Sequence, residues 1–335
     1  MNENAEVREE VFYEKKKGRK NTGLMIFLIV LAVFFGFVFI MAAFSENGAN
    51  SANSPYIAVM HVEGVIQSDN TGYFGESEGY QHQWTLEQID ELMWDDMNKG
   101  IFLFLNTPGG GVYESDELYL KLKEYKEETG RPVYAYMGSM AASGGYYISA
   151  AADKIAANRN CWTGSIGVTL GTVYDISGFL ERYGITAKTI TSGANKSMGS
   201  FTEPMTEQQQ QIYRSLVDEA YLQFVSIVAE GRNMEAERVK QLADGRIYTA
   251  NQAKNLDLVD EVMTMDEAKD DMRKLYGLQD AEFLDFEYED TSVLGSLFAK
   301  LSLPQPEVKG DVSAVLSFVQ NQPDMPISYK CEVLN

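Results

Sequence analysis

The sequence predicts an α/β protein built on a parallel sheet with crossover helices, preceded by one transmembrane helix. Two observations indicate this class. From about residue 56 onward, apolar runs typical of buried strands alternate with segments of helical periodicity. Before them, residues 23–44 form an apolar run without a charged residue. With 335 residues, 45% of them hydrophobic, the chain is long and apolar enough to form a sizeable packed core.

The apolar run is the first element to justify. As a helix at ~1.5 Å per residue it would be roughly 33 Å long, enough to cross a bilayer core of ~30 Å. A cleaved signal peptide is the alternative, but its apolar region is shorter, ~7–15 residues, and ends at small residues. Here the run is longer, and Ala42-Ala43-Phe44-Ser45 is a poor cleavage pattern. We therefore expect an uncleaved anchor.

The charges that flank this run predict its orientation. Basic residues stand just before it, and none follows before Lys99. Positively charged flanks stay on the cytoplasmic side. This predicts a single-pass protein of the cell membrane, with its N-terminus in the cytoplasm and its main domain outside. The basic residues concerned are Lys15, Lys16, Lys17, Arg19 and Lys20.

The expected boundaries divide the chain into five segments. A main folded domain occupies residues 55–288, and the weaker pattern after it, interrupted by prolines, predicts an extended or partly disordered extension. The other segments are a cytoplasmic tail at 1–22, the anchor at 23–44, a flexible linker at 45–54 and the C-terminal extension at 289–335.

Within the main domain, periodicity and composition predict the elements in order. The expected strands are residues 56–66, 100–106, 132–137, 154–157, 166–170 and 185–190. The expected helices begin at Thr85, include Leu118 and Leu122, cover residues 144–152, and begin again at Thr206. Thr85 with Gln88, and Thr206 with Gln209, have the spacing of capping boxes.

Charge and cysteine content exclude some classes of function. The formal net charge of −21 argues against a nucleic-acid partner, which requires a basic surface. The two cysteines, Cys161 and Cys331, have neither CxxC nor metal-site spacing. Two unpaired thiols are the favoured interpretation, and a disulfide between them stays open.

The residues able to carry chemistry are few. The chain has two histidines, His61 in an expected strand and His82 in a polar loop, and structural roles are favoured for both. No histidine pair has zinc-ligand spacing. Ser143 lies among small residues between an expected strand and a helix, a position typical of a nucleophile or of a helix cap. The glycines at 109–111 end the preceding strand and suit either an oxyanion site or a sharp turn.

A serine nucleophile requires a base, and lysine is the remaining choice. A lysine acts as a base only where desolvation lowers its pKa from ~10.4 toward ~7–8. Lys196 fits this requirement best, because no acidic residue occurs between Glu181 and Glu203. Other lysines, such as Lys121, lie on a charged helix face.

Over residues 55–265 the chain resembles signal peptide peptidase A of bacteria, a family with the ClpP/crotonase-like fold. The motifs that carry this resemblance occur in the same order here. They are NTPGGG at 106–111, ASGGYY at 142–147, TGSIGV at 163–168, SGANKS at 192–197 and GRIYTA at 245–250. The resemblance implies that the main domain is a protease domain.

The resemblance also implies roles for five residues. Ser143 would be the nucleophile and Lys196 the general base, and Ser165 would hydrogen-bond the lysine amine and orient it. The backbone N–H groups of Gly110 and Gly144 would form the oxyanion hole. The resemblance implies no metal and no cofactor.

Substrates and assembly follow from the same resemblance. The expected substrates are cleaved signal peptides and other apolar peptides at the outer face of the membrane. Because this chain has a single repeat that bears both dyad residues, a ring-like homo-oligomer is expected, an octamer, in which Ser143 and Lys196 meet across a subunit boundary.

Two alternatives belong to other classes. A catalytically inactive membrane scaffold of the same fold would hydrolyse no peptide, and the joint presence of Ser143, Lys196 and Ser165 counts against it. A crotonase-like acyl-CoA enzyme would need acidic residues beside the oxyanion amides and a cytoplasmic location, which the predicted orientation opposes.

Overall fold

The computed structural model of this chain describes residues 26–32, 34–36, 54–68, 79–288 and 328–330. The chain divides into two compact units, Met1–Ala52 and Asn53–Asn335, which are described separately.

In the first unit, residues 26–32 and 34–36 are helical. No helix in the described part of the chain combines the length and the apolar character needed to cross a membrane. Three expected segments lie wholly or largely outside the described residues: the tail at 1–22, much of the anchor at 23–44 and most of the linker at 45–54. These boundaries stay predictions.

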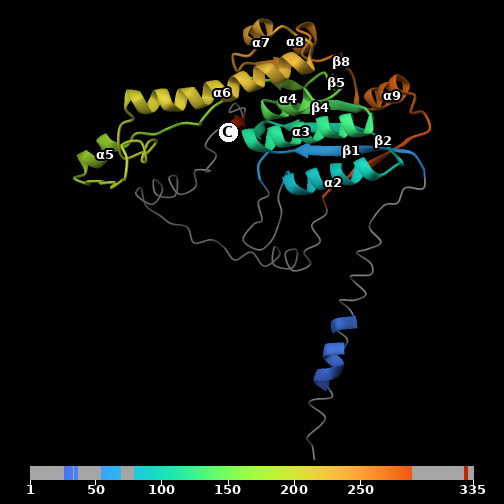
Figure 1. Ribbon diagram of the computed structural model, residues 1–335, viewed down its shortest axis with the longest axis horizontal. Helices are drawn as coiled ribbons and strands as arrows, with labels where there is room; N and C mark the ends of the chain where they lie inside the picture. Colours follow the sequence, from blue (N-terminus) through green and yellow to red (C-terminus); the bar gives the residue numbers. More distant parts are fainter. Residues whose placement is uncertain (1–25, 33, 37–53, 69–78, 289–327, 331–335) are drawn as a thin grey trace, which may run out of the picture. The chain divides into compact units, whose positions relative to one another are not determined.

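The second unit is built on an eight-stranded, largely parallel sheet (Figure 1), which confirms the predicted α/β class. The strand order is β7-β6-β4-β2-β1-β9, while β5 pairs with β4 and β8 pairs with β5. Only the β6–β7 pair in this sheet is antiparallel. The strands are β1 (Tyr56–Glu63), β2 (Asn98–Thr107), β4 (Val133–Ala142), β5 (Lys154–Ala157), β6 (Trp162–Gly164), β7 (Ile247–Thr249), β8 (Glu261–Val262) and β9 (Glu282–Phe286).

Helices connect these strands as crossover connections require. α2 joins β1 to β2 and α3 joins β2 to β4, so that three consecutive parallel strands lie side by side. The helices are α2 (His82–Trp94), α3 (Val112–Thr129), α4 (Gly144–Ser149), α5 (Ser177–Arg182), α6 (Glu207–Gly231), α7 (Ala236–Leu242), α8 (Ala250–Asn255) and α9 (Met265–Tyr276).

The central strands are buried on both faces. Ile57 and Val59 of β1 pack with Met272 of α9 in one core cluster. The alternate residues Ala58 and Met60, equally buried, face the other side of the sheet. Burial on both faces explains why β1 and β2 appear in the sequence as nearly continuous apolar runs.

Several expected elements differ from the structure. Residues 166–170 and 185–190 are not strands. The three-residue strand β6 ends just before the first of these two segments. α2 begins at His82, so the capping box at Thr85 and Gln88 is wrong: the Thr85 hydroxyl donates instead to the Gln81 carbonyl at 2.7 Å.

Other expected elements are confirmed. The capping box at Thr206 opens α6, with the Gln209 N–H donating to the Thr206 hydroxyl and the Gln209 side chain accepting from the Thr206 N–H. The strands predicted at 100–106 and 154–157 fall within β2 and β5, and the strand predicted at 132–137 overlaps β4, which begins one residue later.

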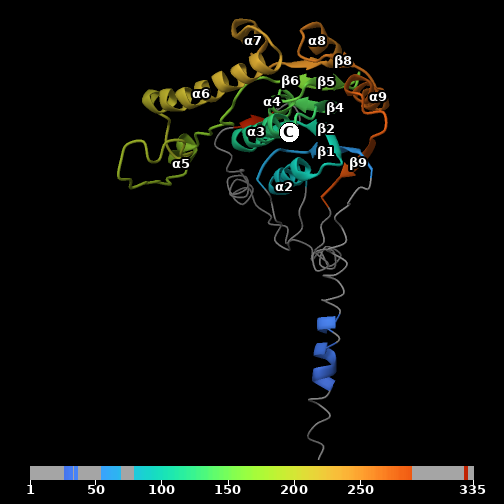
Figure 2. The same cartoon turned by 45° about the vertical axis from the view of Figure 1, so that its right-hand side comes forward.

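The segment between β6 and α6 is long and mostly irregular. Apart from α5, residues 165–206 form turns and extended chain. Figures 1 and 2 both show α5 beside the N-terminal half of α6, away from the central strands. This segment carries exposed apolar side chains, which are Val173, Tyr174, Phe179, Tyr183, Ile185, Ile190 and Phe201.

A short strand near the C-terminus also belongs to the second unit. β10 (Ser328–Lys330) pairs antiparallel with β3 (Gly109–Gly111), with Tyr329 opposite Gly110. The remainder of the predicted extension from residue 289 onward lies outside the described residues.

Candidate active site

Ser143 occupies a sharp turn between β4 and α4. Its φ of 54° and ψ of −115° lie outside the regions that side-chain-bearing residues normally adopt. Two backbone hydrogen bonds fix the turn: Ser143 N–H donates to the Gly164 carbonyl at 2.8 Å, and Tyr147 N–H donates to the Ser143 carbonyl at 2.9 Å. The residue is 1% exposed. This strand-to-helix geometry is typical of nucleophile elbows.

The predicted oxyanion glycines lie against each other beside Ser143. A Cβ atom on Gly144 would lie 3.1 Å from the Gly110 nitrogen. A Cβ on Gly110 would lie 1.7 Å from the Ile66 carbonyl oxygen, so this position admits only glycine. The glycines therefore allow the two backbone segments to approach each other closely.

Ser165 is the fourth residue at this place. It follows β6 directly after Gly164, whose carbonyl binds the Ser143 N–H. Its φ is 49° and it is 8% exposed, and its own N–H donates to the Arg246 carbonyl at 2.8 Å. The structure thus brings Ser143, Ser165, Gly110 and Gly144 together.

Lys196 does not join this group within the single chain. It is exposed and lies in the turn-rich part of the segment that accompanies α6, where its N–H donates to the Gly193 carbonyl at 3.1 Å. Ser143, by contrast, is buried at the start of α4. Among the described residues, no hydrogen bond connects the two side chains.

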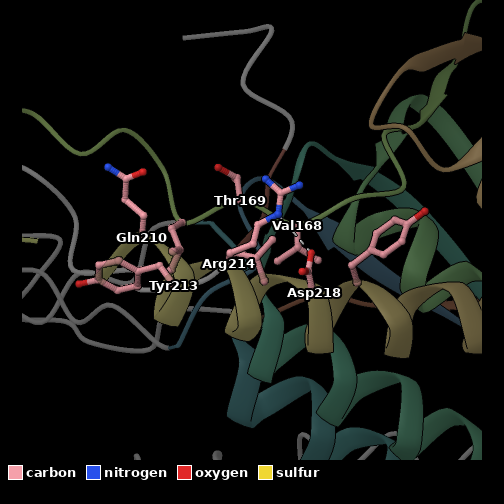
Figure 3. Close-up of a pocket in the computed structure, with 9 residues that line it drawn as sticks. Val168, Thr169, Gln210, Tyr213, Arg214 and Asp218 are labelled. Carbon is pink, nitrogen blue, oxygen red and sulfur yellow. Dashed lines mark ion pairs between the residues drawn. The ribbon is translucent and has the colours of Figure 1, made fainter. Parts of the chain in front are cut away.

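A groove lies between α6 and the chain that follows Ser165, and none of the four grouped residues lines it. It has a volume of about 460 Å³ and includes apolar and charged lining residues. Figure 3 shows the side chains of α6 along one wall and the residues after Ser165 along the other. The labelled lining residues are Val168, Thr169, Gln210, Tyr213, Arg214 and Asp218.

Two buried tyrosines hold α4 in place. The Tyr146 hydroxyl donates to the Leu258 carbonyl at 2.8 Å, and burial raises the pKa of Tyr146 well above its usual range. The Tyr147 hydroxyl donates to Asp116 at 2.5 Å and accepts from Gln223 of α6 at 2.8 Å. Both hydroxyls therefore tie α4 to its surroundings and so position Ser143, the residue that precedes it.

The two histidines form separate contacts. His61 lies between Glu63 and Asp285, at 3.2 and 3.1 Å. His82 is buried, and its Nε2 lies 2.8 Å from a Glu117 oxygen. Neither histidine has a hydrogen bond to Ser143 in the part of the chain that the structure describes.

No group of three or more His, Cys, Asp or Glu side chains within the described ranges is placed to hold a metal ion. Cys161 is free and buried, and burial raises its pKa to about 12. Its thiol is therefore almost entirely protonated at neutral pH and a poor nucleophile.

The register of β10 shows how the site meets an extended chain. On one side of β3, the Gly109 carbonyl and the Gly111 N–H bind the backbone of Ile66. Since backbone groups alternate in direction along a strand, the N–H and carbonyl of Gly110 face the other side, toward β10. This edge of β3 is therefore paired with an extended segment of the chain itself.

One buried polar residue at this place was not predicted from the sequence. Ser115, in the first turn of α3, is completely buried, and a Cβ on Gly144 would lie 2.5 Å from its Oγ. A signal was available: Ser115 shares the helical spacing of the buried residues Leu118 and Leu122, so a hydroxyl interrupts an otherwise apolar stripe.

The assembled groups have the parts required for acyl transfer. A serine in a strained turn stands beside two closely packed glycines and a short strand that pairs with an extended segment, β10. Amides aimed at a developing oxyanion stabilise the tetrahedral intermediate formed when a hydroxyl attacks a carbonyl.

Comparison with known proteins agrees with this chemistry. The sequence profile of peptidase family S49 matches residues 125–279. A protein of Enterococcus faecium that carries the name signal peptide peptidase SppA is 38% identical over 264 residues, which cover 79% of this chain and 75% of that protein. A protease of Methanocaldococcus jannaschii is 30% identical over 277 residues, 82% of this chain and 88% of its own. Protease 4 of Haemophilus influenzae is 33% identical over 239 residues, which are 70% of this chain but 37% of that protein.

Fold, site and relatives together define a serine protease of peptidase family S49, to which this chain belongs. Within that family it is an SppA-type peptidase, as the order of its motifs predicts.

Proposed function

We propose that this protein is a membrane-anchored serine endopeptidase that uses Ser143 and Lys196 to degrade cleaved signal peptides and other apolar peptides at the outer face of the cytoplasmic membrane. The observation that carries the proposal is the position of Ser143, in a strained turn against the adjacent backbone of Gly110 and Gly144.

In the proposed mechanism, the Lys196 amine takes the proton of the Ser143 hydroxyl as Oγ attacks the peptide carbonyl. The carbonyl oxygen becomes negative and accepts hydrogen bonds from the amides of Gly110 and Gly144. Lys196 then gives its proton to the leaving amine. A water molecule, deprotonated by the same amine, hydrolyses the acyl ester and releases Ser143. Ser165, which follows the residue bound to Ser143, would orient the amine.

The proposed substrate is an apolar peptide in extended form. The edge of β3 supports this, because it pairs with an extended segment, the chain's own strand β10, next to the proposed oxyanion glycines. The end of β4 that leads into Ser143 is apolar, with Met140 and Ala142 packed against Ile247. The names of the relatives point to signal peptides, which are apolar segments released at the membrane.

The proposed anchor is the uncharged run at 23–44. Its composition and the basic residues before it support a single crossing, with the catalytic domain outside. Such an anchor would keep the enzyme at the surface where its substrates are released.

The dyad itself requires a second copy of the chain. A lysine serves as a base only as the neutral amine, which removal from water favours. In the single chain Lys196 is exposed and apart from Ser143. We propose that the segment around α5 packs on a neighbouring copy in a ring-like homo-oligomer, an octamer, and brings Lys196 to the neighbour's Ser143. The exposed apolar side chains of this segment support such an interface.

The test is complementation between two inactive variants. Ser143→Ala and Lys196→Ala should each abolish cleavage of an apolar reporter peptide, whereas Lys188→Ala, a matched lysine in the same exposed segment, should not. After the two inactive proteins are dissociated, mixed and reassembled, part of the activity should return, because some interfaces pair an intact serine with an intact lysine. Full activity in either single variant would contradict the dyad, and no recovery on mixing would contradict its formation between subunits.

A further inference from the structure

Ser115 is an exception to the way buried polar groups behave in this protein. Its side chain is 0% exposed. Among the residues that the structure describes, its Oγ is the one buried side-chain oxygen or nitrogen without a hydrogen-bond partner. A buried hydroxyl that leaves water and finds no partner costs free energy, so native proteins rarely keep one without a role.

The position of this hydroxyl suggests the role. The point that a Cβ on Gly144 would occupy lies 2.5 Å from Ser115 Oγ and 3.1 Å from the Gly110 nitrogen. Since that point is one bond length from the Gly144 α-carbon, the Ser115 hydroxyl packs against Gly144 and close to Gly110, the two residues whose amides are proposed to bind the oxyanion.

Other buried hydroxyl groups near the site behave differently. The Ser149 hydroxyl, on α4, donates to the Gly145 carbonyl at 2.7 Å. The hydroxyl of Thr163 on β6 donates to the Ala141 carbonyl at 2.7 Å. Both hydroxyls are used within the free protein, whereas that of Ser115 is not.

We propose that Ser115 is a further catalytic residue, whose hydroxyl is a third hydrogen-bond donor to the oxyanion. This proposal rests on the proposed function, since it requires acyl transfer at Ser143. In the free enzyme the hydroxyl has no acceptor. When Ser143 attacks and the substrate carbonyl oxygen becomes negative, that oxygen supplies the acceptor. An interaction that forms only in the transition state raises kcat rather than substrate affinity.

The principal test is Ser115→Ala, assayed with an apolar reporter peptide on the assembled protein. We expect kcat to fall roughly 10- to 100-fold, which is the usual worth of a hydrogen bond to a charged oxygen, with KM nearly unchanged. The melting temperature should stay the same or rise, because the substitution removes an unsatisfied polar group.

A second readout separates catalysis from packing. A peptide aldehyde adds to a serine hydroxyl, with a new C–O bond and the former carbonyl oxygen in the oxyanion position. Ser115→Ala should weaken inhibition by this aldehyde by the same factor as kcat. The matched control is Ser149→Ala, which removes an equally buried hydroxyl that already has a partner. It should lower the melting temperature but leave the ratio of aldehyde affinity to KM unchanged.

Two results would overturn the proposal. If Ser115→Ala keeps both the wild-type kcat and the wild-type aldehyde affinity, the hydroxyl has no part in catalysis. If Ser149→Ala weakens aldehyde binding as strongly, the effect belongs to packing around α4. Ser143→Ala, measured in parallel, keeps the two proposals distinct. If Ser143→Ala is inactive and Ser115→Ala is fully active, only the role of Ser115 is refuted. If Ser143→Ala is fully active, the proposed function is refuted, and the role of Ser115 with it.

Discussion

The backbone of Ser143 stores strain at the residue where the chemistry is proposed. A side-chain-bearing residue at φ 54° and ψ −115° costs about 1–3 kcal/mol relative to a relaxed conformation. Hydrogen bonds to Gly164 and from Tyr147 hold it there, and buried tyrosines of α4 fix the helix that follows. These surrounding contacts therefore hold the turn in its strained conformation.

This strain predicts a difference between two inactive variants. Ser143→Gly should be more stable than Ser143→Ala by about 1 kcal/mol, because glycine adopts positive φ without a Cβ clash. Thermal unfolding of the two purified proteins measures the difference. An alanine variant that is as stable as the glycine variant would show that the turn relaxes in solution and carries no strain.

At the scale of elements, the site is made by the carboxyl ends of neighbouring parallel strands. β2 leads into the glycines, β4 into Ser143 and β6 into Ser165. The sequence allowed β2 and β4 to be predicted, because strands buried on both faces appear as long apolar runs. It did not reveal β6, since three residues are too few to show a periodicity.

The wrong strand at 185–190 has a physical reason as well. Its β-branched composition suits a strand, but no described strand pairs with it, and Ile190 is 89% exposed. β-propensity reflects packing against neighbouring strands, so composition alone does not make a strand. Lys196 lies in the same segment. Its position relative to Ser143 could not be derived from the pattern of one chain, because the proposed partner serine belongs to another copy.

α9 is attached to the sheet by one carboxylate. Lys154 Nζ lies 2.7 Å from Asp271, and the Tyr134 hydroxyl donates to the same oxygen at 2.8 Å. Burial alone would raise the pKa of Asp271, but these hydrogen bonds outweigh it and hold that pKa below its usual range. A lowered carboxyl pKa stabilises the folded state above the pKa of the unfolded chain, and the effect is lost as pH falls through the folded pKa.

Asp271→Asn should therefore lower the free energy of unfolding by about 1–2 kcal/mol at pH 7. The difference from the wild type should shrink as the pH falls below about 4, where the wild-type carboxylate becomes protonated. Denaturant titrations at a series of pH values measure this. Asp270→Asn is the control, since Asp270 is exposed on the same helix. A destabilisation that does not depend on pH would count against the ionic contribution.

At the scale of the whole molecule, the chain exposes an apolar surface on the segment around α5. The rings of Phe179 and Tyr183 contact each other at a tilt of 42°, with centroids 4.7 Å apart, yet both side chains are exposed. With a net charge of −21, identical chains repel one another, so an assembly needs a substantial apolar contact to form.

Phe179→Ser should shift the protein toward smaller species and reduce peptide cleavage in proportion, without changing its circular dichroism. Analytical ultracentrifugation over a range of concentrations measures the shift. Trp94→Ser is the matched control, because Trp94 is an exposed aromatic residue at the end of α2. If the Phe179 variant stays fully assembled and active, the interface lies elsewhere.

The tethered strand β10 implies a competition between chain and substrate. Because β10 belongs to the same molecule as β3, its pairing is intramolecular, with an effective concentration on the order of millimolar. A free peptide must displace this resident strand before it reaches Ser143. A protein ending at residue 327 should show a lower KM for the reporter peptide with kcat unchanged, while one ending at residue 330, which keeps the strand, should match the full chain. The pairing of β10 with β3 would then set a threshold concentration of peptide, below which polypeptides are cleaved only slowly.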